Sequence, residues 1–175
     1  MTSDTALILY GPPAAGKDTV TAALPAPYML YRRLKVGPGR TTGYRMGTVD
    51  DLAALHANGQ VIYENRRYGS VYVVDAPEFD LMLTDGLVPV LHLGQPEAVS
   101  TVIAVRPDVH WIVVELWCSR EIAAQRLDAR GTDDMDARLD AWDDTQHLAG
   151  ADLRIDTSEI LPADAARQIL QVGAA

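Results

Sequence analysis

Several features are scarce or missing in this 175-residue chain, and each absence excludes a class of protein. The single cysteine, Cys118, excludes an internal disulfide framework and a zinc site built from several cysteines. No apolar run approaches the roughly 20 residues that a membrane-spanning helix needs. The N-terminus lacks a basic segment before its first short apolar stretch. We therefore expect no secretory signal and a location in the reducing cytoplasm.

An excess of positive charge is also missing. The formal net charge is −9, so we expect neither a nucleic-acid polymer nor a membrane as partner. As a separate expectation, the protein is a monomer or a homodimer. The charge is unevenly distributed, because residues 29–70 hold seven basic and three acidic residues, or +4, whereas the remainder carries −13. A basic segment in an acidic chain favours a small anionic partner such as a phosphorylated substrate, although a solvated surface would give the same pattern.

The most informative stretch is residues 11–19, GPPAAGKDT, which has the spacing G-x-x-x-x-G-K. A short apolar run precedes it and a helical segment follows it. A strand, a glycine loop and a helix in this order direct successive backbone N–H groups toward one point, and Lys17 adds a positive charge for the β- and γ-phosphates. We predict a phosphate-binding loop. Its donor-binding residues are Gly11, Pro12, Ala14, Ala15, Gly16, Lys17, Asp18 and Thr19.

Apolar runs alternate with helical segments along the rest of the chain. Strands are expected near residues 28–31, 61–65, 71–74, 88–94, 110–117 and 153–156. Helices are expected at residues 49–58, 77–84, 96–105, 119–129 and 162–172, and within 135–148. Residues 32–43, rich in glycine, read as a loop. The alternation predicts an α/β fold, with a parallel sheet covered by helices on both faces.

Four parts of the chain resemble the guanylate kinase family of nucleoside-monophosphate kinases. They are the phosphate loop, the approach from Tyr44 to the next helix, the segment 64–70, and residues 126–131. The resemblance spans nearly the whole chain and implies a three-layer P-loop kinase fold in one domain, residues 1–175. Its parts would be a core (1–29, 75–125 and 142–175), a small substrate-binding insertion (30–74) and a short mobile lid (126–141).

The resemblance also implies a function and a set of site residues. It implies ATP- and Mg²⁺-dependent phosphoryl transfer to a small phosphorylated acceptor, with a GMP-like nucleoside monophosphate as the first expectation. The catalytic cations would be Lys17, Arg126, Arg130 and Arg138, with Arg126 and Arg130 also contacting the donor. The acceptor would be bound by Arg32 or Arg33 with Lys35, and by Tyr44, Glu64, Tyr68 and Ser70. His92 is a further candidate from its place at the end of a core strand, where it could contact the acceptor or simply accept a backbone hydrogen bond. Glu64 would read the guanine edge, since guanine presents two N–H donors on one side.

Two departures from the pattern of the guanylate kinase family leave the identity of the acceptor open. The family carries D-x-D at the end of one core strand, where this chain has His92, Leu93 and Gly94. The loop also places Asp18, rather than Ser or Thr, after the lysine, and a carboxylate oxygen suits Mg²⁺, so Asp18 is the predicted metal ligand. This G-K-D ending is similar to the ribose 1,5-bisphosphokinase branch. The alternatives are therefore a kinase of a phosphorylated ribose or an unusual pathway nucleotide, and a non-catalytic guanylate-kinase-like binding module.

Overall fold

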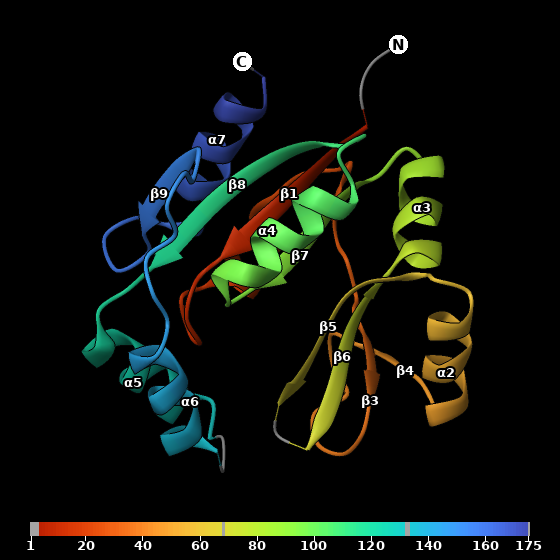
Figure 1. Cartoon of the computed structure of the whole chain (residues 1–175). Coiled ribbons are helices and arrows are strands. Elements are labelled where there is room, and N and C mark those ends of the chain that lie inside the picture. The colour runs from red at the N-terminus through yellow and green to blue at the C-terminus, as the bar shows by residue number, and fades with distance from the viewer. Residues whose placement is uncertain (1–3, 68, 132–133, 175) are drawn as a thin grey trace.

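The computed structural model describes residues 4–67, 69–131 and 134–174, and its main element is a parallel five-stranded sheet (Figure 1). The strand order is β2-β7-β1-β8-β9. The strands are β1 (Thr5–Tyr10), β2 (Tyr28–Leu30), β7 (Val88–Leu93), β8 (His110–Trp117) and β9 (Leu153–Asp156). Every neighbouring pair is parallel, so their carboxyl ends meet at one edge of the sheet. This confirms the predicted α/β class with a parallel sheet.

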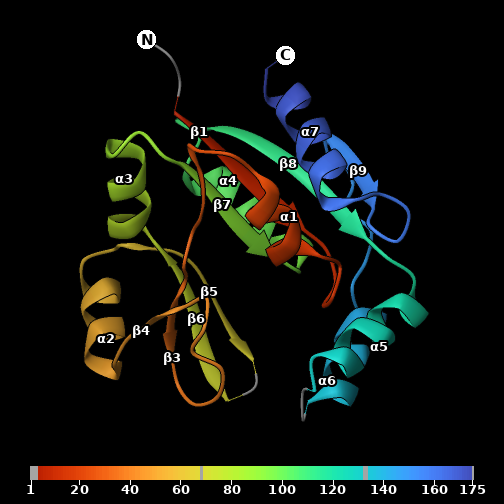
Figure 2. The ribbon, with the colours of Figure 1, turned by 180° about the vertical axis from the view of Figure 1, so that it is seen from behind.

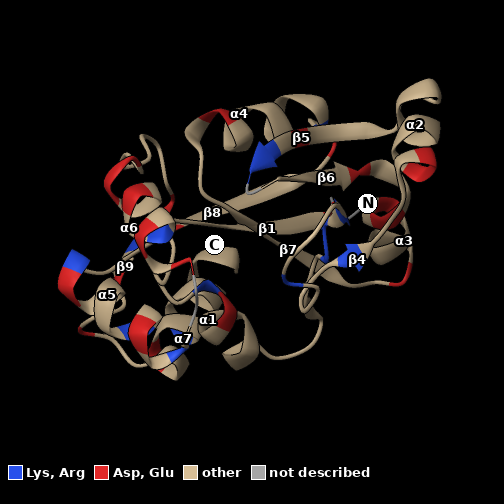
Figure 3. Ribbon diagram, turned by 90° about the horizontal axis from the view of Figure 1, so that it is seen from below, with Lys and Arg blue, Asp and Glu red and all other residues tan. Residues whose placement is uncertain are grey.

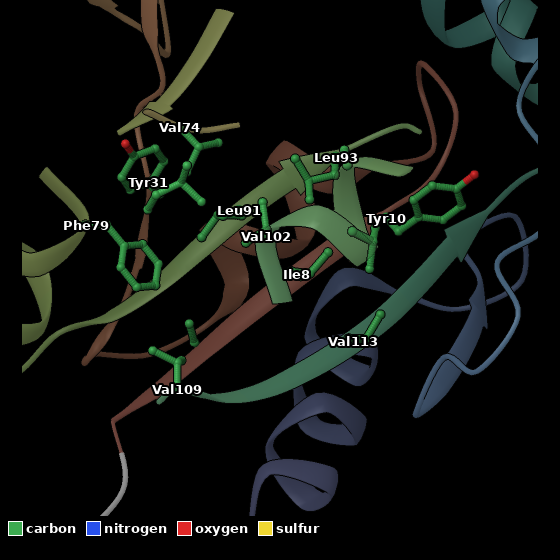
Figure 4. Close-up of a cluster of buried hydrophobic side chains, with 14 of the residues drawn as sticks. Ile8, Tyr10, Tyr31, Val74, Phe79, Leu91, Leu93, Val102, Val109 and Val113 are labelled. Atoms are coloured by element: carbon green, nitrogen blue, oxygen red, sulfur yellow. The ribbon is translucent and has the colours of Figure 1, made fainter. Parts of the chain in front are cut away.

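Helices cover both faces of this sheet because the side chains of β1 alternate between two cores. Ile8 and Tyr10 join the core with α4 (Pro96–Val105), and Leu7 and Leu9 join the one with α1 (Lys17–Ala23) and α7 (Pro162–Gly173). Figures 1 and 2 show α4 on one side of the sheet and α1 and α7 on the other. Figure 4 shows the first core, in which Phe79 and Tyr31 pack beside the strand residues.

A second, four-stranded sheet of order β4-β3-β6-β5 lies beside the first. Its strands are β3 (Leu34–Val36), β4 (Arg45–Met46), β5 (Val61–Arg67) and β6 (Ser70–Asp75), and the helices α2 (Val49–Ala57) and α3 (Ala76–Thr84) accompany it. The prediction of a plain loop over residues 32–43 was wrong for β3. This strand exists because Leu34 pairs with Val73 on β6 and packs into a small core with it, a partnership between segments far apart in sequence.

The last two helices, α5 (Arg120–Ala129) and α6 (Met135–Asp143), follow β8 beyond its carboxyl end. Leu127 and Leu139 pack together in a core that includes Ala14 of the glycine loop. Figures 1 and 2 show this helix pair and the second sheet on opposite sides of the region beyond the carboxyl ends of β1 and β7. Among the described residues, no helix combines the length and the apolar character needed to cross a bilayer.

Candidate functional site

A cavity of about 730 Å³ lies where the glycine loop, the second sheet and the α5–α6 pair meet. Among the described residues, seven basic side chains and two carboxylates line it. The basic residues are Lys17, Arg33, Lys35, Arg40, Arg67, Arg130 and Arg138, and the acidic ones are Asp18 and Asp134. In Figure 3, basic segments appear at β4 and the end of β5, whereas acidic segments mark α2, α3 and α6. An acidic protein therefore carries a cavity suited to anions.

The glycine loop lies tightly against the backbone of β8. Gly11 has a φ of +153°, and a Cβ added there would lie 2.1 Å from the carbonyl oxygen of Leu116. Gly16 has a φ of +93°, and Ala14 also adopts a positive φ of 62°. Positive φ and close backbone approach are the two conditions that favour glycine. Gly11, Ala14, Ala15 and Gly16 all line the cavity, so the loop forms one of its walls.

Replacing Gly11 with alanine is expected to destabilise the protein by about 2 kcal/mol or more, because the new methyl group would collide with backbone rather than with a movable side chain. Gly59→Ala is the matched control, since Gly59 also has a positive φ, of 63°, but its added Cβ would meet nothing within 4 Å. Urea denaturation of both variants measures the difference. Equal losses would mean that left-handed backbone strain, not the contact with Leu116, explains the effect.

Lys17 extends across its own loop and lines the cavity. Its Nζ donates hydrogen bonds to the carbonyl oxygens of Gly11 at 2.6 Å and Pro12 at 2.8 Å. Burial lowers the pKa of Lys17 to about 8, and the nearby Asp18 carboxylate only partly offsets this. The ammonium group is therefore desolvated without a full counter-charge, which favours the binding of an anion next to it.

His92 and Asp18, the two positions at which the sequence departs from the guanylate kinase pattern, lie close to each other. His92 places Nδ1 3.5 Å from Asp18 Oδ1 and Nε2 2.8 Å from Thr21 Oγ1. Burial, followed by the charge of Lys17, lowers the pKa of His92 to about 3, so the imidazole is neutral at physiological pH. A carboxylate only accepts, so we assign the ring proton to Nδ1 and an acceptor role to Nε2. His92 thus lies between the first turn of α1 and the end of β7.

Asp18 is the described residue best suited to a divalent cation. Its carboxylate is 55% exposed and lines the cavity immediately after Lys17. The described residues contain no group of three or more His, Cys, Asp or Glu side chains placed to hold a metal. Mg²⁺ is commonly held by one or two carboxylates together with substrate phosphates. The residues present therefore fit an ion that arrives with a nucleotide.

The three arginines predicted on the α5–α6 segment occupy different environments. Arg126 donates to Ala14 O at 2.9 Å and to Thr157 O at 2.8 Å, so it joins the glycine loop to the segment after β9. Arg130 lines the cavity and makes no side-chain hydrogen bond or ion pair with the described residues. Arg138 also lines the cavity, and its Nε lies 2.7 Å from Asp134 Oδ1. Of these three, Arg130 has the guanidinium group that is most available to a ligand.

On the side of the second sheet, the cavity is lined by a cluster of two cationic side chains and two aromatic rings. The rings of Tyr44 and Tyr72 lie 5.3 Å apart. The guanidinium of Arg33 lies 5.8 Å and 5.3 Å from their centroids, and Nζ of Lys35 lies 5.6 Å from each. All four residues line the cavity, and three of them, Arg33, Lys35 and Tyr44, are among the residues for which acceptor binding was predicted.

Several predicted residues do not line the cavity. Glu64 contacts His56 Nε2 at 2.7 Å and Arg66 at 3.1 Å. Ser70 donates its hydroxyl to Pro38 O, and Arg32 donates to Tyr44 O. The remaining residues outside the lining are Pro12, Thr19 and Arg126. Tyr68 lies outside the described residues, so its predicted role is not addressed.

The sequence reasoning also missed several residues that line the cavity. Those with polar or aromatic side chains include Tyr31, Arg40, Asn65, Arg67, Tyr72, Gln95 and Asp134. Arg67 and Asn65 are two residues apart on β5 and therefore share a face, a signal that strand alternation could have given. Thr157 was missed as well. Its hydroxyl lies 2.9 Å from Ala15 O and 3.0 Å from Trp117 O, and only long-range contacts reveal this support of the loop.

Comparisons with known proteins identify the fold. No protein-family profile and no curated protein matches the sequence. Among solved structures, the chain is similar to a guanylate kinase from Anaplasma phagocytophilum, with a TM-score of 0.63, 15% identity, and coverage of 98% of this chain and 86% of that chain. A sugar kinase from Janibacter sp. HTCC2649 gives 0.55 at 12% identity, with 98% and 95% coverage. A gluconokinase from Sinorhizobium meliloti 1021 gives 0.50 at 15% identity, with 99% and 94% coverage. The chain therefore has the P-loop kinase fold.

Proposed function

We propose that this protein is an ATP-dependent kinase that transfers a phosphoryl group to a small phosphorylated acceptor. The observation that carries the proposal is one cavity in which Lys17 and the glycine loop face Arg33 and Lys35, with Arg130 at the side. Phosphoryl transfer demands little beyond in-line positioning of two anions and neutralisation of the moving group's charge. Fold neighbours that are named as kinases of a nucleotide and of sugars support the same reaction class.

The chain's own residues supply the positioning. The loop and Lys17 would hold the triphosphate of the donor, and Arg33 with Lys35 would hold the acceptor opposite it. An acceptor phosphate oxygen would form a bond to the γ-phosphorus while the bond from that phosphorus to the β–γ bridging oxygen breaks. ADP then leaves with the electron pair of the broken bond. An ionised phosphate oxygen carries no proton, so this reaction needs no general base, in keeping with an imidazole of His92 that stays neutral and buried.

Mg²⁺ would be held by Asp18 together with phosphate oxygens, and it would neutralise charge on the donor. Within the proposed domain of residues 1–175, residues 30–74 would bind the acceptor and residues 126–141 would form a lid that carries Arg130 and Arg138. A lid of this kind excludes water from the transferring group. The proposal includes ATP and Mg²⁺ as cofactors, a cytoplasmic location and this division of the chain.

Two acceptor classes remain within the proposal. A GMP-like nucleotide is supported by the resemblance to guanylate kinases, through Glu64, Tyr68 and Ser70. A phosphorylated sugar is supported by a specific observation, because Glu64 does not line the cavity and basic residues do. A non-catalytic binding module is the third alternative, and the presence of Lys17 in an intact glycine loop argues against it, because such modules typically lack a working phosphate loop.

The test combines nucleotide uptake with a transfer assay. Calorimetry with ATP and Mg²⁺ should show binding, and coupled ADP release should appear with at least one acceptor among GMP, dGMP, AMP, CMP, UMP and ribose 1,5-bisphosphate. Failure to bind ATP would reject the kinase proposal outright. Binding of ATP with no acceptor-dependent ADP release would instead favour the binding module.

A further inference from the structure

The imidazole of His92 contacts two side chains that lie one helical turn apart on α1. Asp18 and Thr21 are three positions apart, so their side chains share one face of this helix. Oγ1 of Thr21 lies 2.8 Å from Nε2 of the ring, and Oδ1 of Asp18 lies 3.5 Å from Nδ1. Both ring nitrogens of His92 therefore face α1, the helix that follows the glycine loop.

The two partners differ in how firmly the fold holds them. His92 belongs to β7, an inner strand of the five-stranded sheet, where it pairs with Leu9 of β1, and its side chain is only 14% exposed. The side chain of Asp18 is 55% exposed. A side chain with this exposure keeps rotamer freedom, which it loses when it binds a cation. A neighbour that is fixed in the sheet can restrict that freedom before the cation arrives.

The direction of each contact follows from the chemistry of the groups. An ionised carboxylate only accepts, so Nδ1 of His92 donates toward Asp18 whether the ring is neutral or charged. In the neutral ring, Nε2 accepts from the hydroxyl group of Thr21, and this contact fixes the rotation of the ring. The distance from Nδ1 to Oδ1 is longer than an ideal hydrogen bond, as is common in unliganded sites, where such contacts shorten once the ligand binds.

The same contacts make His92 poorly suited to bind an acceptor. His92 lines the cavity, but both of its polar atoms face side chains of α1. A ligand that formed a hydrogen bond with the ring would have to displace Asp18 or Thr21. His92 is therefore better placed to act on Asp18 than on an acceptor.

A carboxylate at position 92 would be unfavourable next to Asp18. Without a bound ion, an acidic side chain there would bring two negative charges into contact, whereas the imidazole supplies an N–H donor. The two departures from the guanylate kinase pattern are thus compatible with each other. An aspartate after Lys17 is matched by a donor, not by a second carboxylate, at the end of β7.

We infer, on the basis of the proposed kinase function, that His92 is a positioning residue for the magnesium ligand: Thr21 orients the imidazole, and the imidazole orients the carboxylate of Asp18. Oδ1 of Asp18 is held by His92, and the other oxygen is left for the cation that accompanies the nucleotide. His92 itself contacts neither the cation nor the acceptor.

The metal dependence of ADP binding tests this role. Calorimetry gives the Kd for ADP in EDTA and in saturating Mg²⁺, and the ratio of the two Kd values measures how strongly the metal promotes nucleotide binding. His92→Leu should lower this ratio about tenfold, the loss typical of removing a group that orients a metal ligand, while the Kd in EDTA stays within about twofold of wild type. Equal weakening in both conditions, which a merely structural role would produce, would overturn the inference. A wild-type ratio close to one would do the same, because Asp18 would then hold no cation.

Conservative variants supply the matched controls. Asparagine has nearly the shape of leucine, but its amide nitrogen is bonded to Cγ, as Nδ1 is, and can donate to Asp18. His92→Asn should therefore keep the ratio within about threefold of wild type. Thr21→Val should lower the ratio about threefold, whereas Thr21→Ser, which keeps the hydroxyl group, should leave it within about twofold. Circular dichroism verifies the folding of each variant. Equal ratios in His92→Asn and His92→Leu would contradict the inference.

A double-mutant cycle tests whether His92 acts through Asp18. Asp18→Asn alone should remove most of the effect of Mg²⁺, and adding His92→Leu should change the ratio less than about twofold further, because no carboxylate is left to orient. Additive losses would show that His92 acts by another route and would overturn the inference. An unchanged ratio in His92→Leu would remove the inference alone and leave the kinase function in place. A wild-type protein that bound no ADP in either condition would remove both.

Discussion

Replacing Lys17 with alanine is expected to lower kcat about 10²- to 10³-fold, the loss typical of removing one preorganised charge or donor from a phosphoryl-transfer site. Lys17 lines the cavity and donates only to carbonyl oxygens of its own loop, Gly11 O and Pro12 O, so its charge has no competing carboxylate at hydrogen-bond distance among the described residues. Steady-state kinetics with a coupled ADP assay measure the loss. Turnover within a few-fold of wild type would remove Lys17 from its assigned role.

The low pKa of Lys17 provides an independent readout of the same role. In the ligand-free protein this pKa is about 8, so Lys17 is charged below pH 8 and becomes neutral above it. Because the triphosphate favours the charged form, the apparent affinity for ATP should fall as the pH increases from about 7 to about 9. In Lys17→Ala this part of the pH dependence should disappear. An unchanged pH profile in the variant would assign the dependence to another group.

The same shift has a consequence for folding stability. A lysine side chain in water has an ordinary pKa of 10.5, so between about pH 8 and 10.5 the unfolded chain binds more protons at Lys17 than the folded one. The contribution of Lys17 therefore makes the ligand-free protein more stable as the pH increases through this window. The direction is opposite to the trend in ATP affinity, so the two measurements separate loss of ligand binding from general alkaline unfolding.

Local patterns in the sequence were enough to predict the glycine loop between a strand and a helix, and the parallel sheet. The spacing of Gly11, Gly16 and Lys17 is a local signal, and so is the alternation of apolar runs with helical segments. The loop backbone bears out the need for glycine, because Gly11 leaves no room for a Cβ beside Leu116. These features follow from covalent geometry and short-range sterics, which a single sequence carries directly.

What the sequence did not predict depends on contacts between distant segments. The strand β3 exists through its pairing with β6, and Arg126 is held by Thr157, 31 residues later. The contact between Asp18 and His92 joins two positions that the sequence could only describe as separate departures. For Glu64, the sequence supplied the residue type but not the strand face, and that face decides whether a side chain reaches the cavity.

Replacing Arg130 with alanine is expected to lower kcat by about 10³-fold, the lower end of the effect of an arginine that stabilises a transferring phosphoryl group. Arg130 lines the cavity and has no side-chain partner among the described residues, whereas Arg126 is bound to the loop and Arg138 to Asp134. Because the contact would form mainly in the transition state, the Kd for ATP should change much less than kcat.

Arg120→Ala is the control for Arg130→Ala, because Arg120 begins the same helix but is exposed and pairs with Asp143, 2.8 Å away. Its kcat should stay within about twofold of wild type, in line with the small energetic contribution of exposed ion pairs. Single-turnover kinetics separate the chemical step from product release in each variant. If Arg130→Ala retained more than about a tenth of the wild-type rate in that step, the charge on the moving group would have to be neutralised elsewhere. Arg138 would be the next candidate, since it lines the same cavity and would be available once a ligand displaced it from Asp134.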